Sequence, residues 1–206
     1  MLANRISHVW NSLPSQLAKE NRKFVYQLVR PGARAREYEE ALIWLQNAGL
    51  IHKVSLCQTP LIPLKSYEDL SVFKIYCLDI GLLRVLSELS PEAYFSDAPT
   101  FKEYKGALAE NYILQSLLAN GINCSRYWAS GNKAEVEFIV QHGINIIPIE
   151  VKSGMSVTGK SLNEYNKKYS PAMRVRFSML NLKRDDTLLN IPLFLADRTE
   201  HLCKMM

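Results

Sequence analysis

Cysteine and histidine are scarce in this sequence, and neither is arranged as a disulfide framework or a metal site requires. Four residues of each type are spread over 206 residues, and no two cysteines stand in a C-x-x-C spacing. This pattern excludes a disulfide-rich scaffold and a paired-cysteine zinc site, and it suits a reducing compartment. Apolar runs of the roughly 20 residues that cross a membrane are lacking, as is an apolar signal core. We therefore expect a cytoplasmic protein.

The rest of the composition is typical of a folded chain with a basic surface. Hydrophobic residues make up 48% of the sequence, which supports a sizeable core. The length allows one large or two small domains. The formal net charge of +5 permits an anionic partner such as nucleic acid without requiring one.

The first 90 residues predict helices followed by a two-stranded wing. Apolar positions at helical spacing predict one helix that ends near Pro14, and Pro14 then opens a second short helix. Residues 23–29 are rich in strand formers, and an amphipathic helix follows at about 33–48, capped by Gly49. Strands are predicted at 50–56 and 72–78 around a proline-containing turn. Asp79 then caps a helix that runs to about residue 89.

The segment 41–51, ALIWLQNAGLI, resembles the winged-helix segment of a family of prokaryotic AAA-type ATPases. The resemblance implies a helical and winged-helix module over residues 1–95, which follows an ATPase core not present in this chain. A winged helix reads DNA through a helix in the major groove. The best candidate helix carries Glu37, Glu39 and Glu40, which repel phosphates, so a protein-contact or spacer role stays open. A connector at residues 90–101 separates this module from the second half.

The second half, residues 101–206, begins with a long predicted helix that carries an acid on its apolar side. The helix runs over about 101–120 and ends at Gly121, and its apolar stripe consists of Gly106, Glu110, Ile113, Leu114 and Leu117. A glutamate in such a stripe needs a reason. It is either an ion-paired or stripe-edge residue with its head in solvent, or an inward carboxylate aimed at a sheet.

A β-hairpin predicted downstream presents three more charged residues. After a strand at 123–128 and a turn at 130–132, residues 135–140 alternate, and a turn at 141–143 leads into an apolar run at 146–151. Because side chains alternate along a strand, Glu150 and Lys152 project the same way, and the adjacent strand presents Glu137 towards them. An ordinary ion pair at a solvated strand end explains Glu150 and Lys152 equally well. Carboxylates that converge repel each other unless a cation lies among them, and oxygen ligands favour magnesium.

The order of a helix Glu, a strand acid and a strand Glu-x-Lys resembles the PD-(D/E)xK nuclease superfamily. More specifically, 105–112 (KGALAENY), 135–139 (EVEFI) and 149–154 (IEVKSG) resemble the domain called DUF4143, which caps the same ATPase family. The resemblance implies an α/β (α+β) fold, in which residues 101–206 form a restriction-endonuclease-like α/β/α domain with a mixed central sheet. It makes Glu110, Glu137 and Glu150 ligands of Mg²⁺, and Lys152 the catalytic base or charge stabiliser. The hairpin acid is usually Asp in the superfamily and is Glu137 here. The extra methylene moves the carboxylate outward by roughly one bond length, which bears on cleavage more than on the fold.

A rival motif overlaps the end of this hairpin. Residues 154–161, GMSVTGKS, satisfy the G-x-x-x-x-G-K-[ST] nucleotide-binding pattern before a predicted helix at 162–169. Only 45 residues follow Ser161, whereas a P-loop domain needs several further strand–helix units. Strands are predicted at 175–181 and 193–196. This region is basic, so it either binds a nucleic-acid backbone or forms an ordinary solvated surface. Its basic residues are Lys160, Lys167, Lys168, Arg174, Arg176, Lys183 and Arg184.

Three functions remain as hypotheses from the sequence, and the least favoured is a nucleotide site at Lys160 of the rival motif. In the first, the nuclease-like domain binds or cleaves DNA with a divalent metal at Glu110, Glu137, Glu150 and Lys152. In the second, the same fold binds nucleic acid or a partner protein without cutting.

Overall fold

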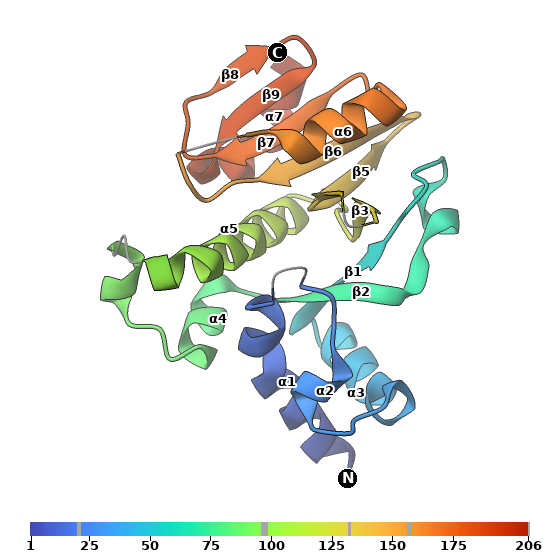
Figure 1. Ribbon diagram of the computed structural model, residues 1–206, viewed down its shortest axis with the longest axis vertical. Coiled ribbons are helices and arrows are strands. Elements are labelled where there is room, and N and C mark those ends of the chain that lie inside the picture. The colour runs from blue at the N-terminus through green and yellow to red at the C-terminus, as the bar shows by residue number, and fades with distance from the viewer. Residues whose placement is uncertain (20–21, 96–98, 132, 156–157, 206) are drawn as a thin grey trace. The chain divides into compact units, whose positions relative to one another are not determined.

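Helices and two mixed sheets make up the computed structural model, which confirms the mixed α and β class (Figure 1). It describes residues 1–19, 22–95, 99–131, 133–155 and 158–205. Part of the predicted connector (96–98), Asn132 of a predicted turn and residues 156–157 of the rival motif therefore lie outside the described residues. The chain divides into two compact units, of which the first holds residues 1–54 and 72–111 and the second 55–71 and 112–206.

The first unit is helical at its N-terminal end. Helix α1 (Leu2–Leu17) packs against α3 (Ala35–Asn47) and α4 (Ile80–Leu86), while α2 (Tyr26–Val29) is a single turn. The predicted apolar stripe of α3 is buried, at Tyr38, Ala41, Leu42 and Leu45. Both predicted caps are confirmed: Gly49 adopts a φ of +71°, and Asp79 Oδ1 accepts a hydrogen bond from the Leu82 N–H at 3.0 Å. The unit also contains much of β1 (Ile51–Leu56), β2 (Asp69–Cys77) and α5 (Pro99–Ala119), and the short 3₁₀ helix η2 (Pro91–Phe95).

Two predictions for the first unit are wrong. Pro14 lies inside α1 rather than ending it, and its carbonyl accepts from the Ala18 N–H at 3.0 Å. Proline removes one helical hydrogen bond, but the apolar face formed by Val9, Leu13 and Leu17 stays continuous and buried across it. Pro14 consequently does not open a second helix, and the stretch 23–29, which is rich in strand formers, ends in the helical turn α2.

The second unit is built on a five-stranded sheet of order β5-β6-β7-β9-β8. β5 (Phe138–His142) and β6 (Asn145–Val151) form the predicted antiparallel hairpin. β6 is parallel to β7 (Arg174–Ser178), which is parallel to β9 (Leu188–Pro192), and β8 (Lys183–Asp185) is the antiparallel edge. Helix α6 (Lys160–Tyr169) connects β6 to β7, and α7 (Thr199–Met205) ends the chain (Figure 1). The remaining elements are η1 (Leu64–Tyr67), β3 (Arg126–Ser130), β4 (Ala134–Val136) and η3 (Leu193–Arg198).

Helix α6 contacts one face of the five-stranded sheet, and α7 borders a cavity at the other face. Arg174, on the face that also carries Arg176, donates to Asn163 of α6 at 3.5 Å. Ile149, on the other face, lines a cavity together with Cys203 of α7. The Glu150 side of the sheet is thus the α6 side, because Glu150 pairs with Arg176 across the two strands.

The alternating stretch 135–140 is two strands rather than the predicted one. β4 pairs with β3, whereas β5 pairs with β6, so the chain changes sheets at Glu137. Val136 and Ile139, which strict alternation places on opposite faces, consequently belong to the same buried cluster. The predicted strand at 193–196 is also wrong, since these residues begin the 3₁₀ helix η3, and strands β8 and β9 were not predicted.

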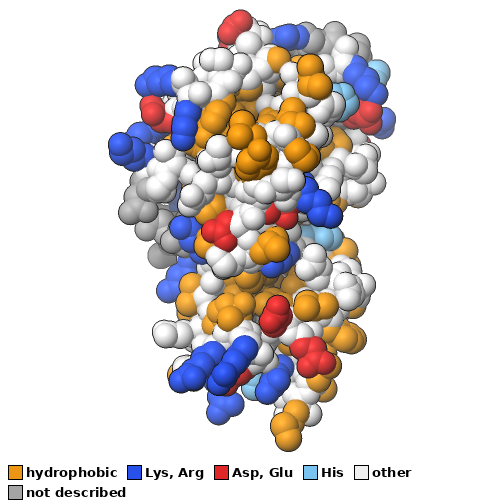
Figure 2. Space-filling model, turned by 90° about the vertical axis from the view of Figure 1, so that its right-hand side faces the viewer, with side chains coloured by type: hydrophobic (Ala, Val, Ile, Leu, Met, Phe, Trp, Pro, Cys, Tyr) orange, Lys and Arg blue, Asp and Glu red, His pale blue; other side chains and the backbone are white. Residues whose placement is uncertain are grey.

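An apolar groove of about 380 Å³ lies at one side of the second unit, where the 60–62 segment meets the β5–β6 turn. Leu61, Ile62 and Ile144 are exposed there, and Tyr165 and Tyr169 of α6 complete the lining. Figure 2 shows hydrophobic side chains gathered on the upper part of the face it views. Within the described residues, no helix is long and apolar enough to cross a membrane.

Candidate functional site

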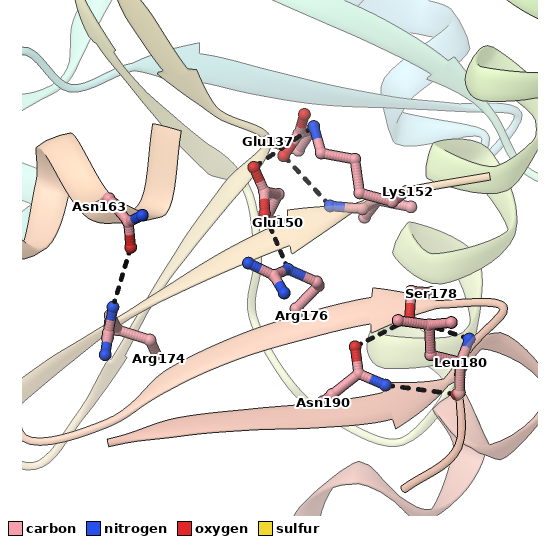
Figure 3. A network of polar contacts seen from close by, with 10 residues as sticks. Glu137, Glu150, Lys152, Asn163, Arg174, Arg176, Ser178, Leu180 and Asn190 are labelled. Atoms are coloured by element: carbon pink, nitrogen blue, oxygen red, sulfur yellow. Dashed lines mark hydrogen bonds and ion pairs between the residues drawn. The ribbon is translucent and has the colours of Figure 1, made fainter. Parts of the chain in front are cut away.

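Glu137, Glu150 and Lys152 come together in the second unit, on the α6 side of the sheet (Figure 3). The hairpin register pairs Phe138 with Ile149, and its continuation by one residue places Glu137 opposite Glu150. Lys152 follows Glu150 by two positions and therefore projects to the same face. Its Nζ lies 3.3 Å from Glu150 Oε1. The sequence pattern alone was enough to anticipate this grouping.

Glu150 is fully buried and faces a second cation that the sequence analysis did not assign to it. The Nε–H of Arg176 donates to Glu150 Oε2 at 3.0 Å, from the position directly across the parallel β6–β7 ladder. The exposed fraction of the side chain is 1% for Glu150, 12% for Arg176 and 30% for Lys152. A buried carboxylate needs such partners, because removing a charge from water without compensation costs several kcal/mol. Glu150 Oε1 accepts no hydrogen bond from the described residues.

Glu137 occupies the one-residue break between β4 and β5. Its Oε2 accepts from the Val151 N–H at 3.2 Å, which ties the sheet crossing to the end of β6. The side chain is almost buried, with 9% of the residue exposed. The extra methylene that distinguishes Glu from Asp is used here to reach a backbone donor on the neighbouring strand.

Glu110 belongs to the first unit, where both of its carboxylate oxygens have protein partners. Oε1 forms an ion pair with Arg22, and Oε2 accepts from the Tyr76 hydroxyl at 3.0 Å. The next residue, Asn111, is fully buried and bonds to Cys77 through both ends of its amide. These contacts attach the middle of α5 to the end of β2. They match the ion-paired alternative for Glu110 that the sequence left open.

The start of α6 closes over Arg176. Gly159 adopts a φ of +57°, and a Cβ atom at this residue would lie 2.3 Å from Arg176 Nη2. The left-handed backbone favours glycine here, and any larger residue would also have to displace the tip of the Arg176 side chain. The adjacent Lys160, the lysine of the rival nucleotide-binding pattern, is exposed as the first residue of α6.

Further polar contacts extend the cluster across the sheet. Arg174 lies between Asn163 of α6 and the Thr187 hydroxyl, which accepts from its Nε–H at 3.0 Å. Ser178 donates to Asn190 at 2.8 Å, and the Asn190 amide donates to the Asn181 carbonyl at 2.9 Å (Figure 3). The Ser178 and Asn190 contacts join β7 and β9 near the end of the sheet where Lys152 lies, whereas Arg174 lies at the opposite end of β7.

Protein groups contact each of the three acids predicted to bind Mg²⁺. Magnesium prefers several oxygen ligands and negative charge around it. Glu110 instead faces Arg22, and Glu150 faces both Lys152 and Arg176. In the part of the chain that the structure describes, no group of three or more His, Cys, Asp or Glu side chains is placed to hold a metal ion. Side-chain cations therefore balance these acids.

The residues that the sequence analysis missed are the partners of the acids. Arg22 is 88 positions from Glu110, and Arg176 is 26 positions from Glu150, so no local spacing pointed to either pair. Arg176 was assigned only to a basic region. Its alternation with Arg174 in a strand was a usable signal, because two arginines on one strand face need partners there.

Comparison with known families gives a match for each half of the chain. Residues 105–194 match the family model for DUF4143, a domain of unknown function. A DUF4143 domain is thus found where the motifs predicted it. Residues 2–93 match the family model for DUF8612, another domain of unknown function. In terms of elements, the DUF8612 match runs from α1 into η2, and the DUF4143 match runs from within α5 to the start of η3.

No curated protein matches the chain. Among solved structures, the crystal structure of protein VC1899 from Vibrio cholerae aligns with a TM-score of 0.32 and 13% identity. The alignment covers 99% of this chain and 51% of that one, so the chain spans about half the length of that protein.

Proposed function

We propose that the DUF4143 part of this chain is a nuclease-like domain that binds DNA without a resident metal ion, in the C-terminal region of a prokaryotic AAA-type ATPase. The observation that carries the proposal is the grouping of Glu137, Glu150 and Lys152 on a mixed sheet. The order α5, β5, β6, α6, β7, with an antiparallel hairpin followed by a parallel crossover, agrees with the nuclease-like fold that the motifs imply. The side-chain cations at Glu150 favour binding over cleavage.

Helix α6 provides the best basic surface for a phosphate backbone. Lys160, Lys167 and Lys168 are exposed on it, whereas Arg174 is buried and Arg176 mostly so. Of the three, Lys167 forms a direct ion pair with Glu164 at 2.9 Å, and Lys160 acts on the same carboxylate from a greater distance. Exposed lysines contribute to DNA affinity by releasing counterions, and the effect is independent of sequence.

Changing Lys160, Lys167 and Lys168 together to Gln is expected to weaken DNA binding and to flatten its salt dependence. Each lost phosphate contact lowers the slope of log K against log salt by about 0.9, so three contacts lower it by up to about 2.7. The measurement is fluorescence anisotropy with a labelled duplex between about 50 and 200 mM salt. Lys204→Gln on α7, which also removes an exposed lysine, is the control and should behave as wild type. Equal slopes for all three proteins, or no binding at all, would contradict the proposal.

Cleavage is the second candidate, because the same three residues match the nuclease motif. Cleavage requires a divalent ion bound to Glu150. The ion can bind the carboxylate oxygen that Arg176 now contacts only if Arg176 releases it. The test is nicking of supercoiled plasmid in Mg²⁺ or Mn²⁺. Loss of nicking in Lys152→Ala, with DNA affinity retained, would favour cleavage over binding.

A further inference from the structure

Glu150, one of the acids of the predicted nuclease motif, has the side chain of Arg176 as a cationic partner. Arg176 lies directly across the ladder from Glu150 and donates to its Oε2 at 3.0 Å. A divalent ion bound to Glu150 Oε2 would need the space that the guanidinium occupies, and its charge has the same sign. We infer that Arg176 stands in for a divalent ion beside Glu150, and that its charge closes this cluster to metal.

Two constraints hold Arg176 in place. Its backbone is fixed between β6 and β9, because Arg176 pairs with Glu150 on one side and Asn190 on the other. Its guanidinium is covered by the backbone of Gly159, where even a Cβ atom would lie 2.3 Å from Nη2. The arginine is therefore held by its ladder position, by its hydrogen bond to Glu150 and by close packing against Gly159.

The charge balance points the same way. Glu137 and Glu150 are matched by Lys152 and Arg176, so the cluster carries two negative and two positive groups. A divalent ion gains little from a neutral site and is repelled by both cations. Removing the charge of Arg176 leaves the cluster with a net charge of −1. Glu150 Oε1, which is buried and has Lys152 Nζ 3.3 Å away, is then the carboxylate oxygen that an ion would use.

The experiment is a titration of the protein with Mn²⁺ alone. Binding is measured by calorimetry and by the loss of the paramagnetic resonance signal of free Mn²⁺. Arg176→Ala is expected to bind Mn²⁺ roughly 10- to 100-fold more tightly than wild type, a range typical when groups around a metal site are changed. Its melting temperature should rise with Mn²⁺, because an ion that binds only the folded state stabilises it. Arg176→Lys keeps the charge and should bind like wild type. Arg176→Ala combined with Glu150→Gln should lose the gain.

Several outcomes would overturn the inference. The wild-type protein could bind Mn²⁺ as tightly as Arg176→Ala does and lose this binding in Glu150→Gln. That result would show that the site is already open to metal. A folded Arg176→Ala protein with no gain shows that its charge is not what excludes the ion. If Arg176→Ala does not fold, Arg176→Gln removes the charge and retains a donor, and the wild-type titration still decides whether the cluster is open. The inference shares the Glu137–Glu150 grouping with the proposed function but needs no DNA, so either can fail alone.

Discussion

Asn111→Ala is expected to destabilise the first unit by roughly 2–6 kcal/mol. The Asn111 amide accepts from the Cys77 N–H at 2.8 Å and donates to the Cys77 carbonyl at 3.0 Å, and the residue is fully buried. Alanine removes both partners, and each buried backbone group left without a hydrogen bond costs about 1–3 kcal/mol. The contact also joins α5 to the end of β2, so its loss should loosen two elements together.

Urea denaturation followed by circular dichroism measures this effect. Asn11→Ala is the matched control, because Asn11 lies on an exposed part of α1 and its amide donates to Ser7 Oγ at 3.5 Å. Its change in stability should stay within about 0.5 kcal/mol. A cost below about 1 kcal/mol for Asn111→Ala would show that water or a shifted backbone replaces the amide.

Arg176→Met is expected to cost roughly 3–5 kcal/mol, because it leaves the buried Glu150 carboxylate with Lys152 as its only ion-pair partner among the described residues. Methionine fills similar volume, so the loss of charge rather than of packing is measured. The double change Arg176→Met with Glu150→Met should recover most of the loss, since apolar residues of similar volume often replace a buried ion pair at little cost.

The exposed pair of Lys167 and Glu164 provides the control for this cycle. Lys167 Nζ lies 2.9 Å from Glu164, but the two side chains are 73% and 43% exposed. Lys167→Met should therefore change the free energy of unfolding by no more than about 1 kcal/mol. If Arg176→Met costs no more than Lys167→Met, or if the double change recovers nothing, Glu150 does not depend on Arg176.

The sequence predicted best those features whose causes are local. The α3 stripe, the Gly49 cap and the Asp79 cap each depend on residues within a few positions, and all three are present. The same holds for the β5–β6 hairpin, whose short turn sets its register. That register is enough to bring Glu137 to Glu150 and Lys152.

The features that escaped prediction depend on contacts between distant residues. Pro14 is a local signal to end a helix, but burial of the α1 face outweighed it. Alternation along 135–140 carries no information about which sheet each half joins, so the crossing at Glu137 was invisible. The partners of Glu110 and Glu150 come from segments 88 and 26 positions away, and their identity follows only from the folded chain.

The crossing at Glu137 couples two events that a sheet would otherwise keep separate. The carboxylate that faces Glu150 also accepts the Val151 N–H, at the point where the chain passes from one sheet to the next. A ligand that draws this carboxylate away must release a backbone donor near the C-terminal end of β6. Binding of such a ligand to Glu137 and Glu150 is therefore thermodynamically linked to opening of the C-terminal end of β6. A change that stabilises this strand end weakens binding of the ligand, and binding of the ligand destabilises the strand end.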